Sequence, residues 1–162
     1  MLNNYEKATD LIQKNVDLFV SGFCPCSECS IQKIEQALNS KIPSDYVRFL
    51  RTFGLLNFGG AEVFGIFRDE IDGIYLGNMI TRTLNERNEG KMPSNLIVIE
   101  DTGWDGELYC LQINENDPDK SPVVVYVHPT VPIEVLTPDF GTYLLQRVQQ
   151  EIEYQRNEGN KG

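Results

Sequence analysis

The chain has 162 residues, a length typical of one domain that buries its own hydrophobic core. Its 24 acidic and 14 basic residues give a formal net charge of −10, which disfavours nucleic acid and anionic lipid as partners and favours a cationic partner. Charged residues interrupt the first twenty positions, so we expect neither a signal peptide nor a membrane span. We therefore expect a cytoplasmic protein with reduced cysteines, a single domain over residues 1–155 and a flexible polar tail at 156–162.

Helices are predicted in the first third of the chain. Apolar residues recur at helical spacing from Tyr5 to Phe19 and again from Ile31 to Leu38. Ser27 is a candidate N-cap of the second of these helices. A third helix is predicted over residues 43–53, with Pro43 at its start and Gly54 as its C-terminal stop.

The segment FCPCSEC joins the first two predicted helices. Cys24, Cys26 and Cys29 lie within six residues, but the spacing lacks the second pair of ligands that a structural zinc site requires. A reduced turn between helices is the interpretation that we favour. A metal site and a redox switch stay open as alternatives.

The second half of the chain has the composition of a β-sheet. Gly59 and Gly60 predict a tight turn that feeds a strand, and a short helix is predicted over 78–89. Three runs of β-forming residues follow, with short polar connections that favour antiparallel pairing: 96–100, 107–113 and 122–127. Thr137 as N-cap and Pro138 at the first helical position predict a closing helix. The predicted fold class is therefore α+β, a single domain with a largely antiparallel β-sheet packed by N-terminal helices and a C-terminal helix.

Catalytic motifs are hard to find. The single histidine, His128, stands at a strand end without a serine or cysteine at a motif spacing that would make it a catalytic base. The glycines at 59 and 60 lack the lysine and hydroxyl residue of a phosphate-binding loop. We expect no enzyme activity and no cofactor.

The segment EDTGWDGE is the richest polar cluster. Asp101 and Asp105 echo two ligand positions of an EF-hand loop, but Gly103 replaces a ligand between them. We expect instead a β-turn in which Gly103 and Gly106 have positive φ.

Trp104 lies at the tip of that predicted turn, among Glu100, Asp101, Asp105 and Glu107. A large aromatic side chain inside an acidic ring is typical of a protein-contact hot spot. The alternative is that Trp104 folds back over the sheet, and the sequence leaves both open.

Residues 34–66 resemble the opening of the SUKH superfamily, and the later strands and closing helix extend the similarity to about residues 28–155. The pattern is a helix with an early glutamate, a proline, a helix with Tyr and Phe-Leu, and a glycine turn into a strand. The positions that match it are Glu35, Pro43, Tyr46, Phe49, Leu50, Gly60 and Gly65.

This resemblance implies a non-catalytic bacterial immunity protein that binds and neutralises a toxin domain, often a nuclease, released by competing cells. A regulatory interaction module with an endogenous partner is one alternative. A metal-dependent enzyme that uses the cysteines with Asp101 or Asp105 is the other. The contact residues that we expect, from charge and loop position, are Glu62, Asp101, Trp104, Asp105 and Glu107. The toxin, the binding face and the oligomeric state stay open.

Overall fold

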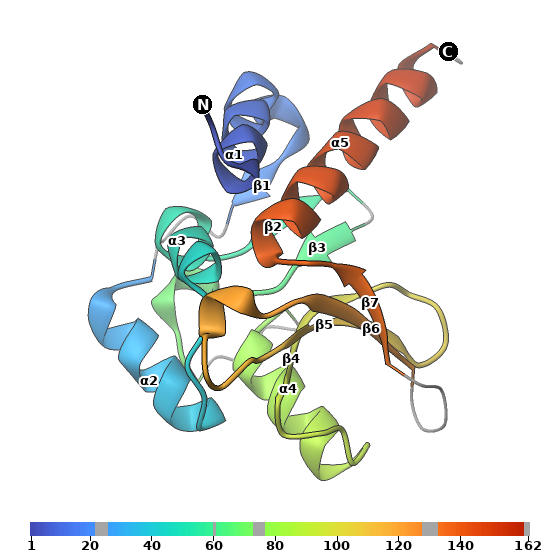
Figure 1. The fold of residues 1–162 in the computed structure, drawn as a ribbon. Helices are drawn as coiled ribbons and strands as arrows, with labels where there is room; N and C mark the ends of the chain where they lie inside the picture. Colours follow the sequence, from blue (N-terminus) through green and yellow to red (C-terminus); the bar gives the residue numbers. More distant parts are fainter. Residues whose placement is uncertain (22–25, 60, 73–76, 128–132, 161–162) are drawn as a thin grey trace.

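The computed structural model describes residues 1–21, 26–59, 61–72, 77–127 and 133–160. Within them, helices surround two antiparallel sheets, one of three strands in the order β1-β2-β3 and one of four in the order β4-β5-β6-β7 (Figure 1). The predicted α+β class is confirmed, although the strands form two sheets. Phe64 N–H donates to the Ile99 carbonyl at 2.7 Å and so links the segment after β3 to β4.

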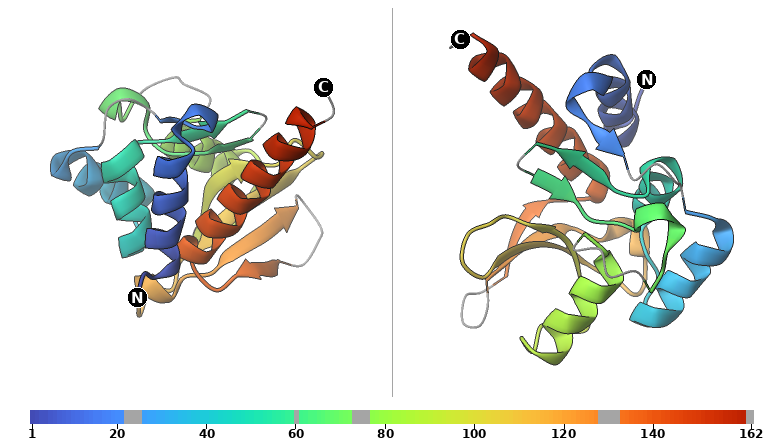
Figure 2. Two further views of the ribbon diagram at one scale, coloured as in Figure 1. Left: turned by 90° about the horizontal axis from the view of Figure 1, so that it is seen from above. Right: turned by 180° about the vertical axis from the view of Figure 1, so that it is seen from behind.

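The N-terminal helix is shorter than its apolar pattern predicts. α1 (Asn4–Lys14) begins with a capping box, and the chain then forms a 3-10 turn, η1 (Val16–Leu18), and the short strand β1 (Val20–Ser21). The prediction of one helix with an apolar face from Tyr5 to Phe19 is therefore wrong beyond Lys14, and Val16 is 67% exposed. α1 packs beside α5 (Phe140–Gly159), as both views in Figure 2 show.

The next two helices follow the prediction closely. α2 (Glu28–Leu38) is capped by Ser27, whose hydroxyl accepts the Ser30 N–H at 3.1 Å. α3 (Ser44–Phe53) begins after Pro43. The Ser44 N–H donates to Asp119 Oδ1 at 2.7 Å, and this hydrogen bond lowers the pKa of the Asp119 carboxyl.

Residues of the SUKH pattern hold α3 to the sheets. Tyr46 is fully buried, and its hydroxyl donates to the Phe64 carbonyl at 2.7 Å. A Cβ added to Gly65 would lie 1.7 Å from the Gly54 carbonyl oxygen, so only glycine permits this close backbone approach. Gly60, which also matches the pattern, lies outside the described residues. These contacts indicate that the pattern specifies the scaffold.

The three-stranded sheet contains a hairpin where the sequence indicated one strand after a glycine turn. β2 (Leu56–Phe58) pairs with β3 (Ala61–Val63), and Gly59 has a φ of +77° in the turn between them. A 3-10 turn, η2 (Phe67–Asp69), follows. The predicted helix over 78–89 is confirmed as α4 (Met79–Asn88).

The four-stranded sheet contains the three predicted strands and one further strand. Its elements in chain order are β4 (Leu96–Asp101), β5 (Glu107–Gln112), the 3-10 turn η3 (Pro118–Lys120), β6 (Val123–Val127) and β7 (Glu134–Thr137). The prediction that Thr137 caps the closing helix, with Pro138 at its first position, is wrong, because Thr137 is the last residue of β7. Asp139 caps the helix, and its Oδ1 accepts the Thr142 N–H at 2.7 Å.

Helices cover the two faces of this sheet (Figure 1). On one face the rings of Tyr109 and Tyr143, from β5 and α5, meet edge to face at 6.3 Å. On the other face the Thr83 hydroxyl of α4 accepts the Val98 N–H at 3.0 Å. α5 continues to Gly159, so its last turns extend into the segment for which a flexible tail is expected.

Candidate functional site

The β4–β5 turn is a compact, hydrogen-bonded hairpin tip. Asp101 Oδ1 accepts the Gly103 N–H at 2.9 Å, and the Trp104 carbonyl accepts the Glu107 N–H at 3.0 Å. The expected positive φ angles are confirmed at Gly103, with +81°, and at Gly106, with +74°. Since its backbone is held by these bonds, the tip loses little backbone conformational entropy on binding.

Trp104 projects from this tip into solvent. The residue is 76% exposed, so its ring does not fold back over the sheet. The backbone N–H of Trp104 donates to the Thr102 hydroxyl at 3.3 Å, and the Thr102 hydroxyl in turn donates to the Glu107 carbonyl at 3.2 Å. An exposed tryptophan on a well-held turn is a geometry suited to insertion into a partner's surface.

The acidic residues around Trp104 differ in their environments. Asp101 pairs with Arg82 of α4 at 2.8 Å, so part of its charge is balanced within the protein. Asp105 is exposed, and Glu107 is half-buried at the start of β5. Asp101 therefore positions the turn, whereas Asp105 and Glu107 contribute negative charge beside the aromatic side chain.

Glu62 lies apart from this group in sequence and in pairing. It is half-buried on β3, where its carboxylate accepts a hydrogen bond from Asn57 at 3.4 Å across the hairpin. The structure thus brings Asp101, Trp104, Asp105 and Glu107 together on one turn and places Glu62 in the other sheet.

Glu100, directly before the turn, is a buried structural residue. A bulge between Val98 and Glu100 interrupts the pairing of β4 with β5, and Glu100 is only 3% exposed. Its carboxylate accepts two hydrogen bonds from Arg147, at 2.9 and 2.8 Å, and one from the Tyr143 hydroxyl at 2.5 Å. Burial lowers the pKa of Arg147, but the hydrogen bonds and charge of Glu100 raise it overall. This network attaches α5 to the sheet next to the hairpin tip.

The predicted cysteine turn is only partly described. Cys26 is buried and its N–H donates to the Leu50 carbonyl at 3.0 Å, whereas Cys29 is exposed on α2. Cys24 and His128 lie outside the described residues. Within the described part of the chain no three His, Cys, Asp or Glu side chains are grouped as a metal would require. Cys26 therefore contributes to the hydrophobic core.

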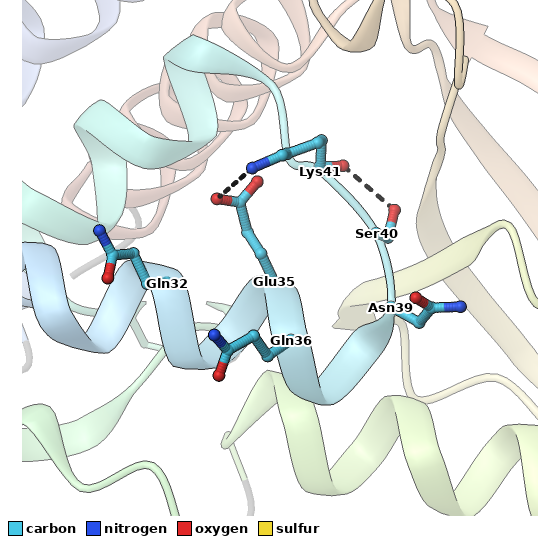
Figure 3. Close-up of a pocket in the computed structure, with 6 residues that line it drawn as sticks. All are labelled: Gln32, Glu35, Gln36, Asn39, Ser40 and Lys41. Carbon is cyan, nitrogen blue, oxygen red and sulfur yellow. Dashed lines mark hydrogen bonds and ion pairs between the residues drawn. The ribbon is translucent and has the colours of Figure 1, made fainter.

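A cavity of about 530 Å³ lies beside the C-terminal half of α2, a feature that the sequence analysis missed. Figure 3 shows the six residues that line it, with Lys41 reaching toward the carboxylate of Glu35: Gln32, Glu35, Gln36, Asn39, Ser40 and Lys41. The two charged groups are 3.7 Å apart, and Glu35 also accepts the Ile42 N–H at 3.2 Å. The Ser40 hydroxyl donates to the Lys41 carbonyl at 3.1 Å, so this serine is not activated as a nucleophile. The lining offers hydrogen bonds to a polar partner.

Comparison with known families assigns the fold. A SUKH family model, described as SMI1-KNR4 cell-wall, matches residues 28–144, which is well over half of the chain. The protein therefore belongs to the SUKH superfamily. The match begins at the first residue of α2, so α1, η1 and β1 precede it.

Membership of this family is consistent with an immunity protein or a protein-interaction module, and it indicates a protein partner. No helix among the described residues combines the length and apolar character needed to cross a membrane.

Proposed function

We propose that this protein is a non-catalytic immunity protein that binds and neutralises a toxin domain of a bacterial polymorphic toxin system, such as a nuclease. It acts in the cytoplasm, where such a toxin would reach its target. Membership of the SUKH family and the net charge of −10 support this function. The observation that carries the proposal is the exposed Trp104 on a hydrogen-bonded turn with Asp105 and Glu107 beside it.

The chemistry of the hairpin tip fits a basic protein surface. Trp104 provides a large apolar contact, and buried tryptophans are among the residues that dominate binding free energy at protein interfaces. Asp105 and Glu107 attract cationic groups and steer the partner toward the tip before contact. A nuclease carries such cationic groups where it holds phosphate, so an acidic inhibitor can cover that surface.

The remaining predicted residues have secondary roles in this proposal. Asp101, held by Arg82, keeps the turn in place for Trp104. Glu62 adds negative charge from β3 if the partner extends over the three-stranded sheet.

The family description favours a second candidate function. It refers to cell-wall proteins, and a regulatory module with an endogenous partner could use the same hairpin tip. The two functions differ in the partner: a toxin domain encoded near the gene, or a housekeeping protein of the same cell.

A growth assay tests the proposal. Toxin domains encoded beside the gene are expressed in a sensitive strain together with the wild-type protein, with Trp104→Ala or with Tyr154→Ala as a matched exposed aromatic on α5. We expect the wild type and Tyr154→Ala to restore growth and Trp104→Ala to fail while remaining folded. If none of the toxin domains is neutralised by the wild type, the immunity function is wrong; if Trp104→Ala protects fully, the tip is not the contact surface.

A further inference from the structure

The four-stranded sheet ends in an exposed strand that is separate from the hairpin tip. Among the described strands, β7 pairs only with β6 and is therefore the edge of the sheet. Three of its four residues are exposed: Glu134, Val135 and Leu136. An edge strand presents backbone N–H and C=O groups that no neighbouring strand uses.

Apolar side chains make this edge unusual. Val135 is 65% exposed and Leu136 is 38% exposed. Soluble proteins commonly protect such edges with lysine, proline, short strands or bulges. β7 is short and contains a bulge, but its sequence, EVLT, has one acid and neither lysine nor proline. A short stretch of this edge is therefore open to pairing, and its acidic residue favours a cationic segment.

The pairing register joins this edge to the hairpin tip. Val125 of β6 lies opposite both Tyr109 of β5 and Glu134 of β7, and Val127 lies opposite Glu107. Because alternate residues of a strand share a face, these five side chains lie on one face of the sheet. Neighbouring strands are about 4.8 Å apart, so β7 lies about 10 Å from β5, within the reach of a single partner domain.

We propose that β7 binds an extended, basic segment of the partner protein by adding it to the sheet as a fifth strand. Main-chain hydrogen bonds would supply affinity, Val135 on one face of the sheet would contact every second side chain of the added strand, and Glu134 on the opposite face would pair with the cationic side chains between them. Glu107, two strands away on β5, would add negative charge on the same face as Glu134. This inference rests on the proposed function for the identity of the partner, but it concerns a different surface and pairing mode.

A second copy of this chain fits the edge less well. Each copy carries a net charge of −10, so two copies repel one another. A four-residue strand that contains a bulge, at the register shift opposite Val123 and Val124, also buries far less than the roughly 1,200 Å² of a stable interface. The same bulge limits strand addition to a short stretch, so the hairpin tip must contribute to binding.

The test is an NMR titration that needs no toxin. Amide shifts of the ¹⁵N-labelled protein are followed while a blocked hexapeptide of alternating lysine and valine is added, with a glutamate–valine hexapeptide as the charge control. We expect saturable shifts centred on residues 134–137 with the basic peptide only. Failure of this titration would overturn strand addition without affecting the growth assay, which reads neutralisation by Trp104.

Two variants sharpen the titration. Val135→Lys should weaken the peptide about tenfold by adding a repelling charge to the edge, whereas Val16→Lys makes the same change at an equally exposed valine and should leave binding unchanged. Equal binding by both variants, or shifts centred elsewhere, would overturn the proposal. Shifts of 134–137 that grow with protein concentration alone would assign the edge to a second copy and would also overturn it.

Discussion

Replacing Glu100 by glutamine should destabilise the protein by about 3 kcal/mol, because it leaves a guanidinium largely buried without a counter-charge. The glutamine keeps the shape of the side chain. It loses the negative charge that receives two hydrogen bonds from Arg147 and one from Tyr143. Hydrogen bonds to a charged group contribute about 1.5–3 kcal/mol each.

The magnitude depends on how far the partner can reach water. Removing one member of a buried ion pair costs about 3–5 kcal/mol. The Arg147 side chain is 18% exposed, so partial rehydration places the expected cost at the lower end of that range. Asp101→Asn is the matched control, because its partner Arg82 is more exposed than Arg147 and keeps a second ion pair with Glu86, so the loss should cost at most about 1 kcal/mol.

Urea unfolding followed by circular dichroism at 222 nm measures both changes, and a double-mutant cycle with Arg147→Met isolates the pairwise coupling. We expect Glu100→Gln to lower the free energy of unfolding clearly more than Asp101→Asn. Equal effects of the two variants, or a coupling near zero, would refute the view that this network attaches α5 to the sheet.

Three further predictions concern the scaffold. Gly65→Ala should prevent folding or cost more than about 4 kcal/mol by thermal unfolding, because its Cβ meets backbone, whereas Gly159→Ala, in open space, should be neutral. Burial raises the pKa of the Cys110 thiol, so iodoacetamide at pH 8 should label the exposed Cys29 and spare Cys110 until the protein unfolds; equal labelling of the native protein would contradict this. A backbone hydrogen bond from the start of α3 lowers the pKa of Asp119 in the folded protein. The ionised Asp119 therefore stabilises the fold fully above its unfolded pKa of about 3.9, and this stabilisation is lost as the pH falls through its lower pKa in the folded state. The Tm difference between the wild type and Asp119→Ala should therefore shrink between pH 5 and pH 2, and a constant difference would exclude this role.

Local sequence signals predicted most of the regular structure. Runs of β-forming residues placed three strands of the larger sheet, and Ser27 and Gly54 marked helix ends through cap chemistry. β7 was missed because it is only four residues long and Thr137 before Pro138 resembles a helix cap. A strand this short forms because it pairs with β6. The connection from Val127 to Glu134 is longer than the two-residue turn by which a tight hairpin is recognised in a sequence.

The candidate site depended more on tertiary structure. The sequence shows that Trp104 lies among acidic residues. It does not show that Trp104 is exposed, because exposure depends on the direction in which the hydrogen-bonded turn projects from the sheet. Glu100 resembles its acidic neighbours in sequence, yet the β-bulge directs it to Arg147, 47 residues away. The ion pair with the distant Arg147 thus gives Glu100 a structural role, whereas Asp105 and Glu107 stay available to a partner.

The association rate of the partner domain, measured by stopped flow over a range of salt concentrations, tests the central claim most directly. Asp105→Lys/Glu107→Lys is compared with Glu115→Lys/Asp117→Lys, which makes the same charge change in the β5–β6 connection at the opposite end of the sheet. We predict that the hairpin variant associates about tenfold more slowly at low salt, with a weaker salt dependence, and that the control stays close to the wild type. Equal rates for the two variants would contradict binding through the Trp104 turn.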